Sequence, residues 1–177
     1  MTKVPAVILA GGSAVRMGGV DKTLVHHQGR PLLSHILKAL GDDVGPIAIN
    51  ANGDPSRFAG FDLPVLPDVI DGHLGPLAGL LTAMRWADAP HVLVVAGDTI
   101  GLPTGLPDLL TPVPAYIQAA GRDHPTIGLW PTALADDLND YLMAGHRRMM
   151  QWIAKVEARP VAVAAPIRNI NRPEDLR

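Results

Sequence analysis

A glycine-rich segment with two basic side chains follows the first apolar run of the chain. Residues 9–22 read LAGGSAVRMGGVDK. Gly11 and Gly12 lack a Cβ, so the backbone N–H groups there can approach a phosphate closely. Arg16 can donate two parallel hydrogen bonds to phosphate oxygens, and Lys22 can supply a point charge. The segment predicts a phosphate-binding loop, although its spacing matches neither the dinucleotide fingerprint nor the P-loop; a flexible turn with solvated cations is the alternative.

A carboxylate at the end of the strongest strand signal predicts a metal site. Asp98 follows five apolar residues, 92–96, and a glycine. A carboxylate in this position can hold Mg²⁺ against a triphosphate, whereas an Asp that only caps a turn is the alternative. A zinc site is not expected, because only His26 and His27 are close together among the seven histidines and no Cys or acidic residue completes a ligand spacing.

Strand and helix signals alternate along the chain, and these elements must position the polar residues. Short apolar runs predict strands at residues 7–9, 47–49, 65–66, 92–96, 115–119, 126–130 and 161–164. Apolar residues at helical spacing predict helices at 31–40, 76–87, 134–142 and 149–155, with a terminal helix from Pro173. The alternation predicts an α/β, Rossmann-like fold: a mostly parallel sheet with helices on both faces, in which ligands bind beyond the carboxyl ends of the strands.

Composition limits the classes of protein that fit. The chain of 177 residues is 47% hydrophobic and 18% charged, which is typical of one globular domain spanning residues 1–177. A net charge of −2 gives no basic excess for nucleic-acid binding. No basic cluster lies beside an apolar stretch, so no membrane contact is expected, and the absence of Cys excludes disulfides and fits a cytoplasmic protein.

The order of several motifs resembles one family of enzymes. LAGG, RMGG and DK within residues 9–22 resemble the signature of nucleotidyltransferases that act on sugar phosphates and on molybdopterin. The resemblance continues through NAN at 50–52, GPLAG at 75–79, GDT at 97–99, RDHPT at 122–126, GHRR at 145–148 and NINRPED at 169–175. RDHPT together with the Asn-x-Asn ending is most similar to the molybdopterin branch, and within it to the molybdenum cofactor guanylyltransferases.

This resemblance implies an activity and a set of site residues. It implies transfer of GMP from GTP to the phosphate of the molybdenum cofactor with release of pyrophosphate, with Mg²⁺ as cofactor, the N-terminal part binding GTP and the C-terminal part binding molybdopterin. The implied catalytic residues are Arg16, Lys22 and Asp98, with Asp98 also the metal ligand. The implied GTP contacts are Leu9, Ala10, Gly11, Gly12, Lys22, Asn50, Asp68 and Asp98. The implied molybdopterin contacts are Arg122, His124, Arg147, Arg148, Asn169 and Asn171.

Backbone geometry predicts how two pairs of these residues are oriented, and the loop after Asp98 departs from the family pattern. If Arg147 and Arg148 lie on a helix, they point about 100° apart. Asn169 and Asn171 face the same side if their segment is extended. The family usually has Pro two residues after the metal Asp, where this chain has Ile100, so the loop there can differ in shape.

Two other functions stay open at this stage. Cytidylyl or sugar-phosphate nucleotidyltransferases share the first motif, but their cytidylyl members resemble this pattern with Ala where the chain has Gly11, and a glycine leaves room for a larger purine. A non-catalytic protein that binds GTP or carries the cofactor is the alternative from another class. The resemblance also implies transient contacts with proteins that supply or receive the cofactor.

Overall fold

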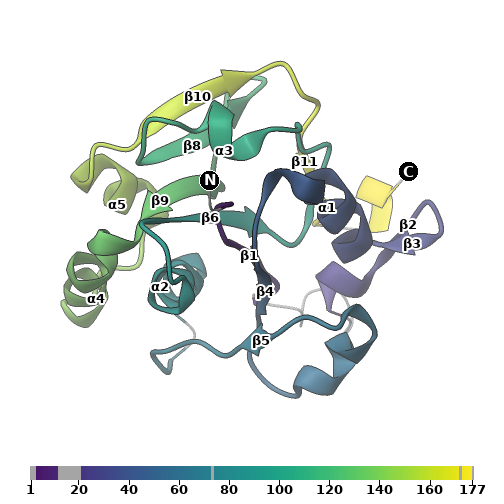
Figure 1. The fold of residues 1–177 in the computed structure, drawn as a ribbon, viewed down its shortest axis with the longest axis horizontal. Coiled ribbons are helices and arrows are strands. Elements are labelled where there is room, and N and C mark those ends of the chain that lie inside the picture. The colour runs from purple at the N-terminus through teal and green to yellow at the C-terminus, as the bar shows by residue number, and fades with distance from the viewer. Residues whose placement is uncertain (1–2, 12–20, 73, 172, 177) are drawn as a thin grey trace.

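A seven-stranded sheet forms the centre of the computed structural model, which describes residues 3–11, 21–72, 74–171 and 173–176 (Figure 1). The strand order is β10-β8-β9-β6-β1-β4-β5. The strands are β1 Ala6–Leu9, β4 Ile47–Asn50, β5 Val65–Leu66, β6 His91–Ala96, β8 Ala115–Ala119, β9 Arg122–Pro131 and β10 Arg159–Val163. Only β9 runs antiparallel to its neighbours within this sheet, so the predicted mostly parallel, Rossmann-like sheet is confirmed.

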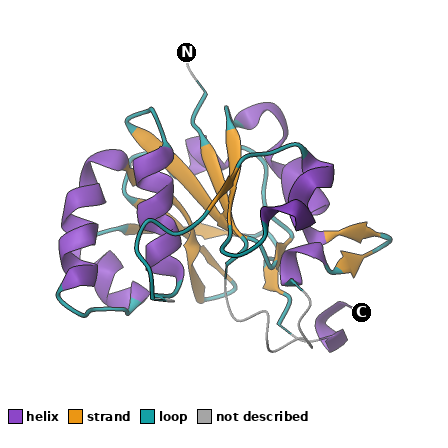
Figure 2. Ribbon diagram, turned by 90° about the horizontal axis from the view of Figure 1, so that it is seen from below, coloured by secondary structure: helices purple, strands orange, loops and turns teal. Residues whose placement is uncertain are grey.

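Helices cover both faces of the sheet (Figure 2). The α-helices are α1 Leu32–Leu40, α2 Pro76–Trp86, α3 Leu106–Leu109, α4 Ala135–Met143 and α5 Met149–Lys155. Short 3-10 helices are η2 Lys22–Leu24, η3 Gly41–Asp43, η4 Pro55–Phe61, η5 Thr132–Leu134 and η6 Pro173–Leu176. The terminal helix expected from Pro173 is therefore a single 3-10 segment. In the part of the chain that the structure describes, no helix combines the length and the apolar character needed to cross a bilayer.

Two hydrophobic clusters lie on opposite faces of the sheet. On the α1 face, Ala6 and Ile8 of β1 pack with residues of α1, α3 and η4. On the α2 face, Val7 and Leu9 pack with residues of α2, α4 and α5. Successive side chains of a strand point to opposite faces, and both faces are covered here, which is why β1 and β6 read as continuous apolar runs.

Two small ladders and one irregularity shape the carboxyl edge of the sheet. Strand β2 His26–His27 pairs with β3 Arg30–Pro31, and β7 Thr99–Ile100 pairs with β11 Arg168–Asn169, both antiparallel. The β8–β9 register shifts between Tyr116, opposite Gly128, and Ile117, opposite His124, so residues 125–127 form a bulge in β9. The polar segment expected to lead into a strand thus belongs to β9 itself.

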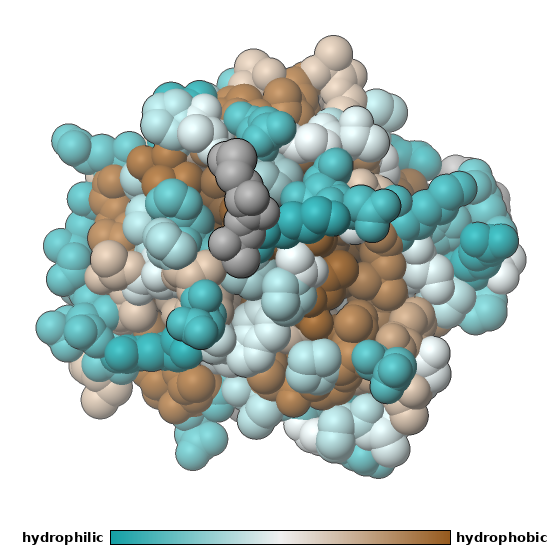
Figure 3. Space-filling view, viewed as in Figure 1, coloured by the Kyte–Doolittle hydropathy of each residue, from teal (hydrophilic) through white to brown (hydrophobic). Residues whose placement is uncertain are grey.

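Surface hydropathy on the face seen in Figure 1 does not single out a partner-binding patch. Several separate hydrophobic areas lie there, divided by hydrophilic side chains (Figure 3). Buried polar groups and the topology of the sheet instead point to its carboxyl edge.

Candidate functional site

The carboxyl ends of three adjacent parallel strands bring together most of the predicted nucleotide residues. Leu9 at the end of β1 is in register with Asn50 of β4 on one side and with Ala96 of β6 on the other. The Ala10 N–H donates to the Asn50 carbonyl at 2.9 Å, and the Gly97 N–H donates to the Leu9 carbonyl at 2.8 Å. These bonds fix the start of the glycine-rich segment between the segments that carry Asn50 and Asp98.

Three side chains near β4 and β5 form an amide cluster, consisting of Asn50, Asn52 and Asp68. The Asn50 Nδ2 donates to Asp68 Oδ1 at 2.9 Å and to the Leu66 carbonyl at 3.1 Å. The Asn52 Nδ2 donates to Asp68 Oδ2 at 2.9 Å, and the Asn52 Oδ1 accepts the Asp68 N–H at 2.8 Å. Both carboxylate oxygens of Asp68 are thereby held by amides, which gives the cluster a fixed geometry. Asn52 belongs to the NAN motif at 50–52 but was not among the predicted site residues.

Two glycines lie beside the Asn50 side chain, with different steric roles. A Cβ at Gly79, in the first turns of α2, would overlap the Asn50 amide and would lie 2.8 Å from Leu9 Cδ2. Gly79 is therefore required for the close approach of α2 to β1 and β4. A Cβ at Gly11 would meet Asn50 Oδ1 at 3.8 Å, an ordinary contact, so the space next to Asn50 on this side is open to a small substituent.

Lys22 and Asp98 lie close enough to interact electrostatically, and Asn171 joins them. The Lys22 Nζ donates to Asn171 Oδ1 at 3.0 Å. Burial raises the pKa of the Asp98 carboxyl above its usual value, and the positive charge of Lys22 partly opposes this rise. A partly buried carboxylate beside a lysine is an arrangement found at functional sites more often than at simple turns.

Two buried oxygens lie in the β7–β11 ladder, which begins directly after Asp98. Asn169 pairs with Thr99, and the Ile170 N–H donates to the Asp98 carbonyl at 2.7 Å. The Asn169 Oδ1 and the Thr99 Oγ1 are buried and have no hydrogen-bond partner among the described residues. Such atoms cost free energy unless a ligand, ion or water satisfies them. Ile100, at the position of the family's Pro, pairs with Arg168 in the same ladder, which fixes the loop after Asp98.

The oxygen donors at this point fit a hard divalent cation. Among the residues that the structure describes, no group of three or more His, Cys, Asp or Glu could hold a metal ion. Asp98 and Asn169 would instead supply one charged and one neutral oxygen. Mg²⁺ is commonly bound in this way, by one or two carboxylates with the remaining positions taken by substrate phosphates and water.

The residues predicted to contact molybdopterin fall into two groups. Arg122 and His124 are in register with Ala119 and Ile117, which belong to the α1-face cluster, so their side chains share that face. Asn169 and Asn171 lie beside β7 and η2, which both contact α1.

Arg147 and Arg148 form the second group, in the turn between α4 and α5 on the α2 face. Neither residue lies on a helix, so the angle of about 100° does not apply: Arg148 is the N-cap of α5, and Arg147 precedes it. The Arg147 Nη1 donates to the carbonyls of Leu142 and His146, both at 2.6 Å, and so caps the end of α4. Both arginines are exposed.

Some predicted residues cannot be placed, and one unpredicted residue is prominent. Gly12 and Arg16 lie outside the described residues. Arg57, in η4, was not predicted, because a single Arg in a polar segment carries no pattern in the sequence. It contacts both Asp21 and the main chain of Asn52.

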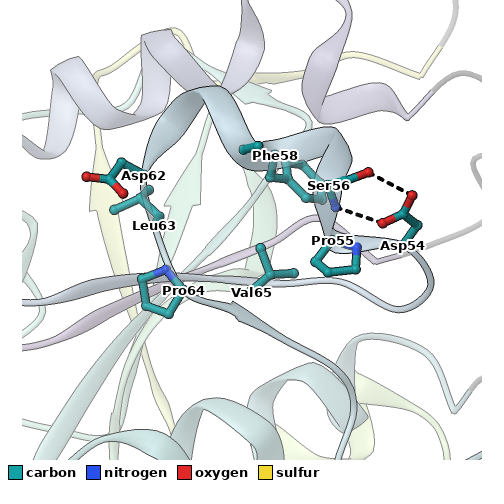
Figure 4. A pocket seen from close by; sticks show the side chains of 9 residues that line it. Asp54, Pro55, Ser56, Phe58, Asp62, Leu63, Pro64 and Val65 are labelled. Carbon is teal, nitrogen blue, oxygen red and sulfur yellow. Dashed lines mark hydrogen bonds between the residues drawn. The ribbon is translucent and has the colours of Figure 1, made fainter.

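An open cavity of about 620 Å³ lies between η4 and β5 (Figure 4). Its walls include Phe58, Leu63 and Val65, and none of the predicted site residues lines it. Asp54 at its rim caps η4 through bonds from the Ser56 N–H and hydroxyl at 2.9 and 2.7 Å, which lower the pKa of Asp54. Because this carboxylate is already engaged in capping, the cavity does not replace the Asp98 region as the candidate site.

Comparisons with known proteins agree with the geometry. A model of the MobA-like NTP transferase domain matches residues 6–161. A molybdenum cofactor guanylyltransferase of Mesorhizobium japonicum is 41% identical, with 98% of this chain and 92% of the relative covered. One of Cereibacter sphaeroides is 44% identical, with 96% and 92% covered. The solved structure of molybdopterin-guanine dinucleotide biosynthesis protein A from Archaeoglobus fulgidus is similar in fold, with a TM-score of 0.71 at 17% identity over 98% of this chain and 95% of that one. The predicted family membership is confirmed: this chain is a nucleotidyltransferase and belongs to the MobA-like NTP transferase family.

Proposed function

We propose that the protein transfers GMP from GTP to the phosphate of the molybdenum cofactor and releases pyrophosphate. Relatives that share 41–44% of their residues with almost the whole chain are named molybdenum cofactor guanylyltransferases. The observation that carries the proposal is the position of the amide cluster and of Lys22 and Asp98 at the carboxyl ends of neighbouring parallel strands. A nucleoside and its triphosphate could occupy these two regions together.

The amide cluster is the proposed nucleoside site. Amide and carboxylate groups can pair with the donors and acceptors of a guanine edge and with ribose hydroxyls. The Leu9 carbonyl already accepts the Gly97 N–H, so a contact from the base to Leu9 would use the second lone pair of that oxygen. Gly11 leaves space beside Asn50 that an Ala would partly fill, which favours a purine.

Lys22, Arg16 and Asp98 form the proposed phosphate and metal site. Asp98 and Asn169 would hold Mg²⁺, which neutralises phosphate charge when bound. Lys22 would exchange its bond with Asn171 for one with a phosphate oxygen, and Arg16 would add a second cation. In the transfer, an oxygen of the cofactor phosphate forms a bond to the α-phosphorus while the bond from that phosphorus to the bridging oxygen of pyrophosphate breaks. The attacking phosphate is already ionised, so positioning is the main task and no general base is needed.

Two groups of basic and amide residues form the proposed molybdopterin site. Arg122, His124, Asn169 and Asn171 would contact the cofactor from the α1 face, and Arg147 and Arg148 from the α2 face. The cofactor would then lie across the carboxyl edge of the sheet. We further propose that residues 1–177 act as one domain, in the cytoplasm, with transient contacts to proteins that supply or receive the cofactor and no role for nucleic acid or membranes.

Pyrophosphate release tests this function directly. Purified protein is supplied with Mg²⁺ and GTP, CTP or ATP, with and without molybdopterin, and the product is identified by mass. We expect turnover with GTP only when molybdopterin is present. Faster turnover with CTP, or transfer to a sugar phosphate in place of molybdopterin, would contradict the proposal, as would GTP binding without any turnover.

A further inference from the structure

Arg57 connects two segments of the site that are distant in the sequence. Its Nε donates to Asp21 Oδ2 at 3.1 Å, and its Nη2 donates to the Asn52 carbonyl at 2.8 Å. The Nη1 donates to the Asp54 carbonyl, and the guanidinium lies 4.7 Å from the centroid of the Phe58 ring. The Asp21 side chain is only 10% exposed and that of Arg57 29%, so the ion pair is largely sheltered from water.

On one side, Arg57 holds the residue that fixes Lys22. Asp21 directly precedes Lys22, and its Oδ1 accepts the Thr23 N–H at 3.0 Å, which caps η2. One oxygen of Asp21 therefore sets the direction of the short helix that carries Lys22, while the other binds Arg57. A change in Arg57 would be transmitted to Lys22 through this carboxylate.

On the other side, Arg57 holds the main chain of the amide cluster. The Asn52 carbonyl accepts from Arg57, and the Asn52 side chain makes two hydrogen bonds with Asp68. A planar guanidinium can donate in several directions of one plane at once, which a lysine ammonium on a flexible stem cannot reproduce. Arg57 therefore connects the segment that carries Lys22 with the amide cluster that contains Asp68.

We propose that Arg57 is a positioning residue for the nucleotide. It fixes the distance between the amide cluster, which takes the nucleoside, and Lys22, which takes the phosphates. This inference rests on the proposed function of the same site. GTP spans both regions, whereas guanosine occupies only the first and tripolyphosphate only the second, so loss of Arg57 weakens GTP binding more than it weakens binding of either fragment.

The test compares Arg57→Ala with Asp21→Asn, in which the amide still caps η2 but loses its charge. We expect each variant to raise the KM and the Kd for GTP about five- to tenfold, as for a partly sheltered charge-assisted pair. The inhibition constants of guanosine and tripolyphosphate change less than about twofold, as expected when only the linkage between two sites is lost. The KM for molybdopterin stays unchanged. The double variant behaves like either single variant, because each change alone already breaks the connection between Asp21 and the amide cluster.

Arg85→Ala is the matched control. It removes an arginine from another ion pair, with Asp136, in which the two side chains are 46% and 84% exposed. This variant should keep wild-type kinetics, and all variants should keep the wild-type melting temperature within a few degrees. An unchanged KM for GTP in Arg57→Ala, multiplicative effects in the double variant, or equal weakening of GTP and both fragments would overturn the inference. Lack of pyrophosphate release by the wild-type protein would instead overturn the proposed function.

Discussion

Replacing Asp98 with Asn separates a metal-binding role from a turn-capping role. Asn keeps the shape of the side chain and is a good turn and cap residue, but it removes the charge. The remaining donors near the proposed metal, such as Asn169 Oδ1, are neutral. A charge-assisted contact contributes about 1.5–3 kcal/mol, so the apparent affinity for Mg²⁺ should fall about ten- to a hundredfold and turnover should fall with it.

The same substitution should leave the metal-free protein as stable as the wild type or more stable. The folded-state pKa of Asp98 is raised by burial, so the native state holds the proton more tightly than the unfolded state. The free energy of unfolding therefore decreases as pH rises from the ordinary carboxyl pKa to the raised one. Above the raised pKa, this loss of stability stays constant. Asp98→Asn removes this loss of stability, because Asn carries no charge at any of these pH values. Each 1 kcal/mol gained in the free energy of unfolding corresponds to a rise of about 2–4 °C in melting temperature for a chain of this size.

Two measurements decide the matter: turnover as a function of Mg²⁺ concentration, and melting temperature without metal from pH 4 to pH 8, where the ordinary carboxyl pKa is about 4. Asp136→Asn serves as the control, since Asp136 is 84% exposed and lies in the first turn of α4, outside the proposed site. The reasoning is refuted if Asp98→Asn retains wild-type turnover at low Mg²⁺. It is also refuted if the variant melts well below the wild type at neutral pH, because that result would indicate a structural carboxylate.

Three further substitutions test the rest of the site. Lys22→Ala should weaken GTP binding about ten- to a hundredfold without a loss of melting temperature, measured by titration calorimetry and thermal denaturation, and unchanged affinity would contradict a phosphate contact. Gly79→Ala should destabilise the protein by about 1–3 kcal/mol, measured by urea denaturation, because the new Cβ overlaps Asn50 and meets Leu9; wild-type stability would show that α2 can shift freely. Gly11→Ala should fold normally but lower turnover with GTP relative to CTP, and an unchanged ratio in the pyrophosphate assay would remove Gly11 from the base pocket.

The central strands of the sheet could be predicted from the sequence because they are buried on both faces. The runs at 7–9 and 92–96 are continuously apolar for that reason, and both lie in the observed β1 and β6. Asp98, which follows the second run after one glycine, then falls at the carboxyl edge as a consequence of parallel topology. A buried strand and the polar residue that follows it can thus be recognised from a few consecutive residues.

Features that depend on distant partners could not be predicted in the same way. The β7–β11 ladder has two residues in each strand, too few for any periodicity, yet it pairs Asn169 with Thr99, the residue after Asp98. The bulge at 125–127 decides which face His124 occupies, and hydropathy does not record it. Arg147 caps a helix instead of lying on one, and Arg57 binds Asp21, which lies 36 positions earlier in the chain.

The hydrogen bond between Lys22 and Asn171 has a consequence for how the enzyme is made. It joins residues 149 positions apart, and the β7–β11 ladder likewise needs residues 168–169. Contacts of such long sequence separation form late, because the chain between them must first be ordered. During synthesis on the ribosome, the N-terminal strands and α1 can emerge and begin to pack long before Asn171 is available. The proposed site is therefore incomplete in the nascent chain until β11 and Asn171 have left the ribosome.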